Sequence, residues 1–173
     1  MEFHKFIDLD RRFLDVAETD DAKNAAVQSY LNELFGIGEQ LDWNELLKSR
    51  IVVILGEAGS GKTWEFRHRV EVLREQGNIA FYLPLERLVG SALRDSLAPV
   101  DSDLFDKWMN GSDQAIFFLD SVDESKLRKQ KDFEFAFENF IRGIGISNRH
   151  RIRVVISSRI SEWRWHADRD IVL

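Results

Sequence analysis

A chain of 173 residues, 44% hydrophobic and 31% charged, can bury one substantial core but is too short for two full domains. Its net charge of −6 argues against electrostatic nucleic-acid binding by the whole molecule, and the lack of cysteine excludes disulfides and thiolate metal sites. No apolar stretch approaches the roughly 20 residues that span a bilayer, and residues 1–13 have no signal-peptide pattern. We therefore expect a cytoplasmic protein with no membrane partner.

Residues 1–41 are acidic and are predicted to form a helical segment that packs on the rest of the chain. Asp20 or Asp21 can cap a helix there, because an apolar stripe with helical spacing follows them. A second, short helix is expected to begin near Asp42 and to carry Trp43 on its apolar side.

The stretch Ile51–Thr63 joins an apolar strand to a glycine-rich loop. Five apolar residues, Ile51–Leu55, predict a strand that is buried on both faces. The sequence GEAGSGKT follows and fits the phosphate-loop pattern G-x-x-x-x-G-K-[ST] at every fixed position. Its glycines permit backbone angles that turn successive N–H groups inward around an anion. A chance glycine-rich turn is the alternative, but the flanking strand and helix are the context that the pattern requires.

The loop and the residue after it are therefore candidate nucleotide contacts. They are Gly56, Glu57, Ala58, Gly59, Ser60, Gly61, Lys62, Thr63 and Trp64. Lys62 is expected to open the next helix and reach the β- and γ-phosphates, and the Thr63 hydroxyl to bind Mg²⁺. The helix N-terminus adds a partial positive charge. Trp43, which precedes the strand, has two interpretations: it covers the nucleotide base, or it belongs to the core.

Helices and strands alternate through the rest of the chain. Helices are expected over residues 62–76, 101–109 and 132–146, with a helical or mixed segment over 85–97. Strands are expected over residues 79–83, 115–119 and 152–156. The phenylalanines of the last helix keep a helical spacing that indicates core packing rather than a cofactor site. This alternation predicts an α/β fold with a parallel sheet.

Acidic residues follow the strand at 115–119. Asp120 is the first polar residue after four large apolar ones, at the strand end where parallel α/β sheets bind ligands. We expect it to hold Mg²⁺ beside the Thr63 hydroxyl, usually through water. Asp123 and Glu124 are both candidates for the catalytic acid that orients or deprotonates an attacking water. The alternative is that Asp120 caps a turn and the other two are solvated.

A third polar strand end follows residues 152–156. Arg159 could sense the γ-phosphate and stabilise charge that develops during phosphoryl transfer, or it could be a surface arginine that neutralises nearby acids. Arginines and tryptophans mix in this region, which is also typical of a nucleic-acid patch. They are Arg149, Arg151, Arg153, Arg159, Arg164 and Arg169, with Trp163, Trp165 and His166. We expect no nucleic-acid partner, because strand, loop and acidic neighbours should occupy several of these side chains.

Together, GEAGSGKT at 56–63, FFLDSVDE at 117–124 and VVISSR at 154–159 resemble the NACHT family of the STAND class of P-loop NTPases. The segment FYLPLERL at 81–88 also looks like the second strand and following turn of that family. The resemblance covers about residues 42–160. Ser121 stands where many members have Gly, and Ile160 follows Arg159 where Pro is common.

The resemblance implies a three-layer sandwich whose parallel sheet has the order 5-1-4-3-2, with helices on both faces. It implies a nucleotide partner, ATP or GTP, with Mg²⁺ as cofactor, and slow hydrolysis in an oligomerising signalling switch, as in bacterial antiviral defence. Residues 42–173 would be the NTPase core. The core would be truncated, with a fifth strand starting at Ile171, and would contact itself or further C-terminal and effector domains.

Three alternatives differ from this NTPase hypothesis in what happens to the nucleotide. A non-hydrolysing module would hold it only to set the conformation of other domains. A P-loop kinase would transfer its phosphate to a small molecule, but such kinases usually have an arginine-rich lid, and the D-S-V-D-E pattern is arranged for water. A DNA-translocating motor would require the arginine and tryptophan cluster to contact nucleic acid.

Overall fold

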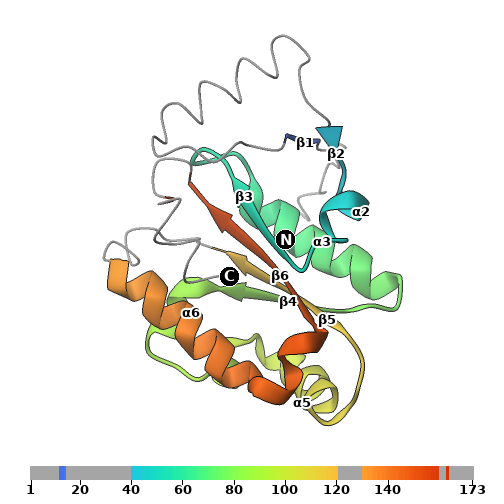
Figure 1. Cartoon of the computed structure of the whole chain (residues 1–173), viewed down its shortest axis with the longest axis vertical. Helices are drawn as coiled ribbons and strands as arrows, with labels where there is room; N and C mark the ends of the chain where they lie inside the picture. Colours follow the sequence, from blue (N-terminus) through green and yellow to red (C-terminus); the bar gives the residue numbers. More distant parts are fainter. Residues whose placement is uncertain (1–11, 15–39, 121–129, 160–162, 164–173) are drawn as a thin grey trace, which may run out of the picture.

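The computed structural model describes residues 12–14, 40–120, 130–159 and 163 (Figure 1). The predicted helix after Asp20 or Asp21 and the predicted strand at Ile171 lie outside these residues. In the part of the chain that the structure describes, no helix is both long and apolar enough to cross a membrane.

A four-stranded parallel sheet forms the centre of the molecule, in the order β3-β6-β5-β4. The strands are β3 (Ile51–Leu55), β4 (Ile79–Pro84), β5 (Ala115–Asp120) and β6 (Ile152–Ser158). The prediction of an α/β fold with a parallel sheet is confirmed. The β5 strand, which ends in Asp120, is separated from the phosphate-loop strand β3 by β6.

Helices cover both faces of this sheet (Figure 1). The α-helices are α2 (Trp43–Leu46), α3 (Lys62–Glu75), α4 (Leu93–Ser96), α5 (Ser102–Asn110) and α6 (Gln130–Ile144). Short 3₁₀ helices are η1 (Leu85–Val89), η2 (Pro99–Asp101) and η3 (Ile146–Arg151). A separate antiparallel pair joins β1 (Phe13–Leu14) to β2 (Gln40–Leu41).

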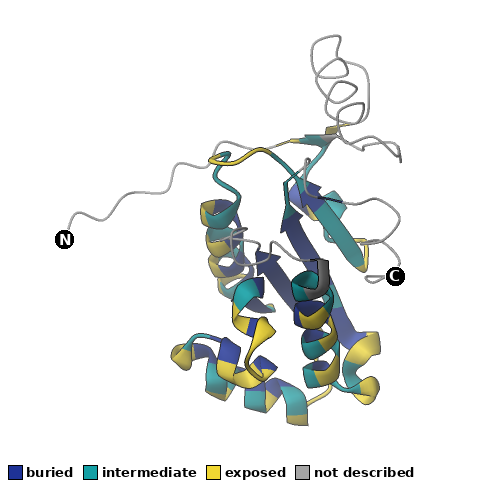
Figure 2. Cartoon of the chain, turned by 90° about the vertical axis from the view of Figure 1, so that its left-hand side faces the viewer, coloured by how far each residue is buried: buried dark blue, intermediate teal, exposed yellow. Residues whose placement is uncertain are grey.

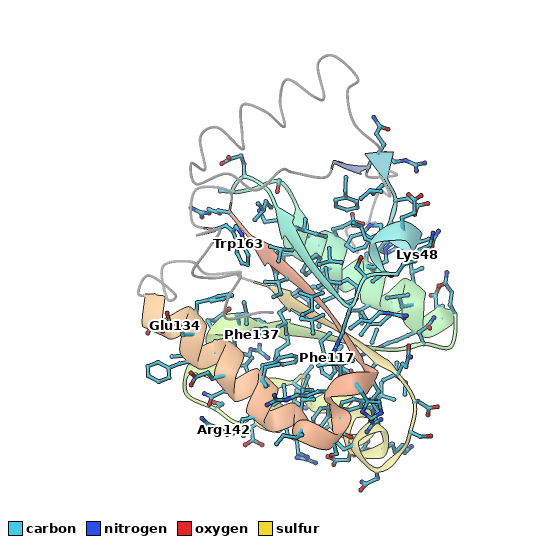
Figure 3. The ribbon with its side chains drawn as sticks, in the orientation of Figure 1. Lys48, Phe117, Glu134, Phe137, Arg142 and Trp163 are labelled. Atoms are coloured by element: carbon cyan, nitrogen blue, oxygen red, sulfur yellow. The ribbon has the colours of Figure 1, made fainter. Side chains whose placement is uncertain are left out.

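Alternating strand residues divide the core into two layers, because successive side chains of a strand point to opposite faces. On one face, Phe117 packs against α5 and α6, and Phe137 of α6 lies between that helix and the sheet (Figure 3). On the other face, Phe118 packs against Phe66 of α3 and Trp43 of α2. Figure 2 shows the buried strands between the two helical layers, whose outer surfaces are exposed.

Local signals explain where the helices begin and how closely they pack. Asp42 caps α2 with a capping box, since its side chain accepts from the Glu45 N–H and the Glu45 side chain accepts from the Asp42 N–H. Gly143 lets α6 approach α4, because a Cβ at this position would collide with Leu93. The sequence predicted the starts of α2 and α3 correctly.

One prediction about the fold needs correction. The strand Ile51–Leu55 was predicted to be buried on both faces, but only Ile54 is buried, because β3 has a single neighbour, β6, among the described strands. The prediction of a helical or mixed segment over 85–97 is confirmed, since this segment contains two short helices, η1 and α4, with Gly90 directly after the first.

Candidate functional site

The glycine-rich loop connects β3 to α3 at the carboxyl edge of the sheet. The Gly56 N–H donates to the Ser158 carbonyl over 3.1 Å, which ties the start of the loop to the end of β6. Gly59 and Gly61 have φ angles of 75° and 84°, in the left-handed region that favours glycine. Gly61 is also the N-cap of α3, so the left-handed turn leads directly into the helix. The sequence motif therefore forms the strand–loop–helix unit that it predicts.

Lys62 folds back over this loop. Its Nζ donates to the carbonyl oxygens of Gly56 and Glu57 over 2.7 and 2.8 Å, and to the Ser60 Oγ over 3.3 Å. A Cβ on Gly56 would lie 3.3 Å from the Ser60 Oγ and 3.6 Å from the Lys62 Nζ, so a side chain there would crowd the ammonium group. The Lys62 ammonium therefore lies against the loop backbone, where its charge would add to that of the N–H groups in binding an anion.

The remaining loop residues expose their surface to solvent. Glu57, Ala58 and Gly59 are exposed, whereas Thr63 in the first turn of α3 is half-buried. Trp64 follows Thr63 with 59% of its surface exposed, which is high for so large an apolar side chain. The exposed backbone at a helix N-terminus is suited to bind an anion.

Asp120 ends β5 and is almost fully buried, with 1% of its surface exposed. One carboxylate oxygen accepts a hydrogen bond from the Tyr82 hydroxyl over 2.9 Å, and the other accepts one from the Ser157 hydroxyl. Burial of the phenol, together with the Asp120 charge, raises the pKa of Tyr82. The phenol therefore stays protonated and acts as a donor to Asp120.

Tyr82 and Ser157 were not predicted as partners of Asp120. The sequence nevertheless contains a pattern that could have identified each of them. Tyr82 is a polar aromatic residue on the same strand face as Ala80, and Ser157 is the first polar residue after the apolar run of β6. Each lies on the sheet face that α3 covers, and so does Asp120, because it follows Phe118 by two positions.

The phosphate loop and Asp120 lie at the same edge of the sheet but do not belong to adjacent strands. The β6 strand lies between them, so their strand axes are about 10 Å apart at a spacing of about 4.8 Å per strand. Groups at this separation can meet across a bound phosphate, ion or water, rather than by direct contact.

Asp123 and Glu124, the two candidates for the catalytic acid, lie outside the described residues. Arg159 directly follows β6 at the carboxyl edge, and its carbonyl accepts from the Trp163 N–H over 3.1 Å. The structure therefore brings Arg159, Asp120 and the phosphate loop to one edge.

Two members of the arginine and tryptophan cluster are core residues. The Arg151 guanidinium donates to the carbonyls of Trp108, Met109 and Asp113 over 2.8 to 3.2 Å and is 5% exposed. Trp163 is equally buried and packs edge-on against Phe133 of α6. Neither side chain is available to an exposed nucleic-acid surface.

Trp43 is a core residue as well. It is 4% exposed, and its ring makes edge contacts with Phe13 and Phe66. Its indole N–H donates to the buried Glu65 carboxylate over 2.7 Å, and the Arg69 guanidinium stacks 5.0 Å from its ring centre. The interpretation as a base contact does not fit this burial. No pattern of residues indicates that Glu65, two residues after Thr63, is buried.

Among the described residues, no three His, Asp or Glu side chains gather into a metal-binding group. The sequence matches no protein-family model, and no curated protein matches it.

Proposed function

We propose that the carboxyl edge of the sheet binds a nucleoside triphosphate, ATP or GTP, together with Mg²⁺, and hydrolyses it slowly. The observation that carries this proposal is the contact of the Lys62 ammonium with the carbonyls of Gly56 and Glu57, within a loop whose glycines adopt left-handed angles. The same edge carries a buried carboxylate, Asp120.

The donors at this edge fit a magnesium ion shared with phosphate oxygens. Mg²⁺ at such sites usually has one or two protein carboxylates and several waters, so a site with three acidic groups is not needed. Asp120 accepts one hydrogen bond on each oxygen, and an ionised carboxylate has about four acceptor positions. Thr63 and Asp120 would hold the ion, which would supply positive charge that neutralises the phosphates.

In this proposal the loop N–H groups and Lys62 bind the phosphates, and Trp64, exposed beside Thr63, is available to the base or ribose. Asp123 or Glu124 orients the attacking water, as the sequence pattern predicts. Arg159 stabilises charge on the γ-phosphate from the end of β6. These roles are supported by the motifs at 56–63, 117–124 and 154–159.

The wider role follows from the resemblance to NACHT-type signalling NTPases. It would make the chain a cytoplasmic nucleotide switch that assembles with itself or with effector domains, as in antiviral defence. The sheet would gain a fifth strand beside β3 and complete the order 5-1-4-3-2. The observed order of the four described strands, in which β3 is an edge strand, supports this arrangement.

Calorimetric titration with ATP and GTP, each with and without Mg²⁺, tests the proposal. We expect saturable binding that requires Mg²⁺, a preference for one base, and slow phosphate release in a parallel turnover assay. Binding without phosphate release would instead favour a non-hydrolysing module. Phosphate transfer to a metabolite faster than hydrolysis would favour a P-loop kinase. Affinity for either nucleotide that is unchanged in Lys62→Ala would contradict the proposed site.

A further inference from the structure

We propose that Tyr82 is a positioning residue whose hydroxyl fixes the Asp120 carboxylate for Mg²⁺-dependent nucleotide binding. This inference rests on the proposed function of the same site. It assigns a role to the strand β4, which the phosphate-loop, acidic and arginine motifs do not include. The hydrogen bond from the Tyr82 hydroxyl to the Asp120 Oδ2, over 2.9 Å, carries the inference.

The sheet register explains why these two side chains meet. Tyr82 pairs with Phe118, and Pro84 pairs with Asp120, so Tyr82 and Asp120 are diagonal neighbours on adjacent parallel strands. Both project to the face that α3 covers. A tyrosine is long enough to span such a diagonal, whereas a serine at the same position is not.

Two hydroxyl donors from opposite sides determine the orientation of the carboxylate. Tyr82 of β4 donates to Oδ2, and Ser157 of β6 donates to Oδ1. Each oxygen keeps acceptor capacity for a water or an ion. Hydrogen bonds from neighbouring groups hold such a carboxylate in one orientation, so its remaining acceptor positions face one direction. Donors of this kind are known to tune the metal affinity of the carboxylate that they hold.

Tyr82 also connects this carboxylate to the phosphate-loop helix. The Arg67 guanidinium of α3 lies 4.9 Å from the centre of the Tyr82 ring, in the range of a cation–π contact. Arg67 follows Thr63 by four residues, one helical turn further along α3. The contacts therefore run from the phosphate-loop helix through Tyr82 to Asp120 and Ser157.

Titration of nucleotide binding against Mg²⁺ in the Tyr82→Phe chain tests the inference. The substitution removes one hydroxyl and keeps the ring that packs against the core. We expect the Mg²⁺ concentration that gives half-maximal binding of ATP or GTP to rise about tenfold, the lower end of the range for lost outer-shell partners of metal ligands. Nucleotide affinity in EDTA should not change.

Two further variants separate positioning from a general loss of stability. Leu73→Ala removes a buried side chain of the same core layer, about 16 Å along α3 from Lys62. It should lower the melting temperature and leave the Mg²⁺ requirement unchanged. In an Asp120→Asn background, Tyr82→Phe should cause no additional rise in the Mg²⁺ requirement, because the hydroxyl acts through the carboxylate.

The outcomes distinguish this inference from the proposed function. A wild-type chain that binds with Mg²⁺ while Tyr82→Phe shows the same Mg²⁺ requirement would overturn the inference alone. An equal rise of the Mg²⁺ requirement in Leu73→Ala would overturn the inference as well. A Tyr82→Phe chain without a cooperative unfolding transition would also overturn it. A wild-type chain without Mg²⁺-dependent binding would overturn the proposed function and the inference together.

Discussion

The two faces of the sheet differ in what they bury. The face covered by α5 and α6 packs aromatic and aliphatic side chains around Phe117, which contacts the rings of Phe81, Trp108 and Phe140. The face covered by α2 and α3 buries two carboxylates, Glu65 and Asp120, and the Ser157 hydroxyl among its aromatic residues.

Because of this difference, we expect one face mainly to stabilise the fold and the other to take part in the proposed nucleotide binding as well. Burying a polar group costs free energy unless its hydrogen bonds are satisfied, so an apolar layer stabilises a fold without this desolvation cost. The face covered by α3 keeps its carboxylates only with specific donors, Trp43 for Glu65 and Tyr82 with Ser157 for Asp120. We therefore expect substitutions on the α6 side to affect unfolding alone, and substitutions of the buried polar groups and their donors on the α3 side to affect binding as well.

The largest expected effect on stability is on the apolar face. Phe140 is fully buried between Phe117 and Phe137, and Phe140→Ala should lower the free energy of unfolding by about 3–5 kcal/mol. Urea denaturation measures this loss. Phe140→Leu, which keeps most of the volume, should cost less than about 1.5 kcal/mol. An equally small cost for the alanine variant would show that this face is loosely packed.

Arg151 is a buried charged residue on the side of α5, within a layer that is otherwise mostly apolar. Its guanidinium donates to the Trp108 and Met109 carbonyls in the last turn of α5, which ends at Asn110. The Trp108 carbonyl also accepts from the Gly111 N–H. Arg151→Met should lower the free energy of unfolding by about 2–3 kcal/mol and leave nucleotide affinity unchanged. Lysine should restore only part of the loss, since one ammonium cannot reproduce the planar donor fork. Loss of nucleotide binding in a folded Arg151→Met chain would contradict the division between faces.

On the opposite face, Trp43→Phe removes the indole N–H that donates to Glu65 and keeps an aromatic ring, while Arg69 remains paired with this carboxylate. The expected loss is about 1–3 kcal/mol of unfolding free energy, measured by urea denaturation. Because Glu65 lies in the first turn of α3, nucleotide affinity should weaken too. Glu65→Gln is the matched control, since it keeps an acceptor for the indole and should be milder. Weaker nucleotide binding in Phe140→Ala than in Trp43→Phe would contradict the expected difference between the two faces of the sheet.

The smallest expected effect concerns the cap of α2. The hydrogen bond from the Glu45 backbone N–H lowers the pKa of Asp42 below its ordinary value of 3.8. The ionised cap therefore contributes stability above pH 3.8, and this contribution is lost as the pH falls through the lower pKa of the folded state. Asp42→Asn should unfold more easily than the wild type at pH 7 and equally easily in acid. Thermal melts at both pH values measure the difference, and a constant gap would contradict it.

The sequence predicted the order and approximate bounds of the four sheet strands and of α2, α3, α5 and α6 because their signals are local. The apolar runs of β3, β4, β5 and β6, the Asp42 cap and the phosphate-loop pattern each occupy a few consecutive residues. Asp120 at a strand end was predicted by the same reasoning, and Asp120 is the last residue of β5, but its burial was not predicted.

The polar contacts of the core could not be predicted in this way. Tyr82 and Asp120 are 38 residues apart, and Trp43 and Glu65 are 22 apart. Such pairs depend on strand register and on the helix that covers each face, which a pattern of apolar residues does not specify. The lower burial of β3 has a similar cause, since a five-residue apolar run has the same appearance at an edge and in the middle of a sheet.

Thermal unfolding with and without Mg²⁺ and nucleotide, in three chains side by side, tests the central claim most directly. A ligand at 100 times its dissociation constant adds about 2.7 kcal/mol to the stability of a folded protein. The wild type and Phe140→Ala should show the same upward shift in melting temperature, although the variant melts lower. Lys62→Ala should melt near the wild type and show no shift. A full shift in Lys62→Ala, or its loss in Phe140→Ala alone, would contradict the account.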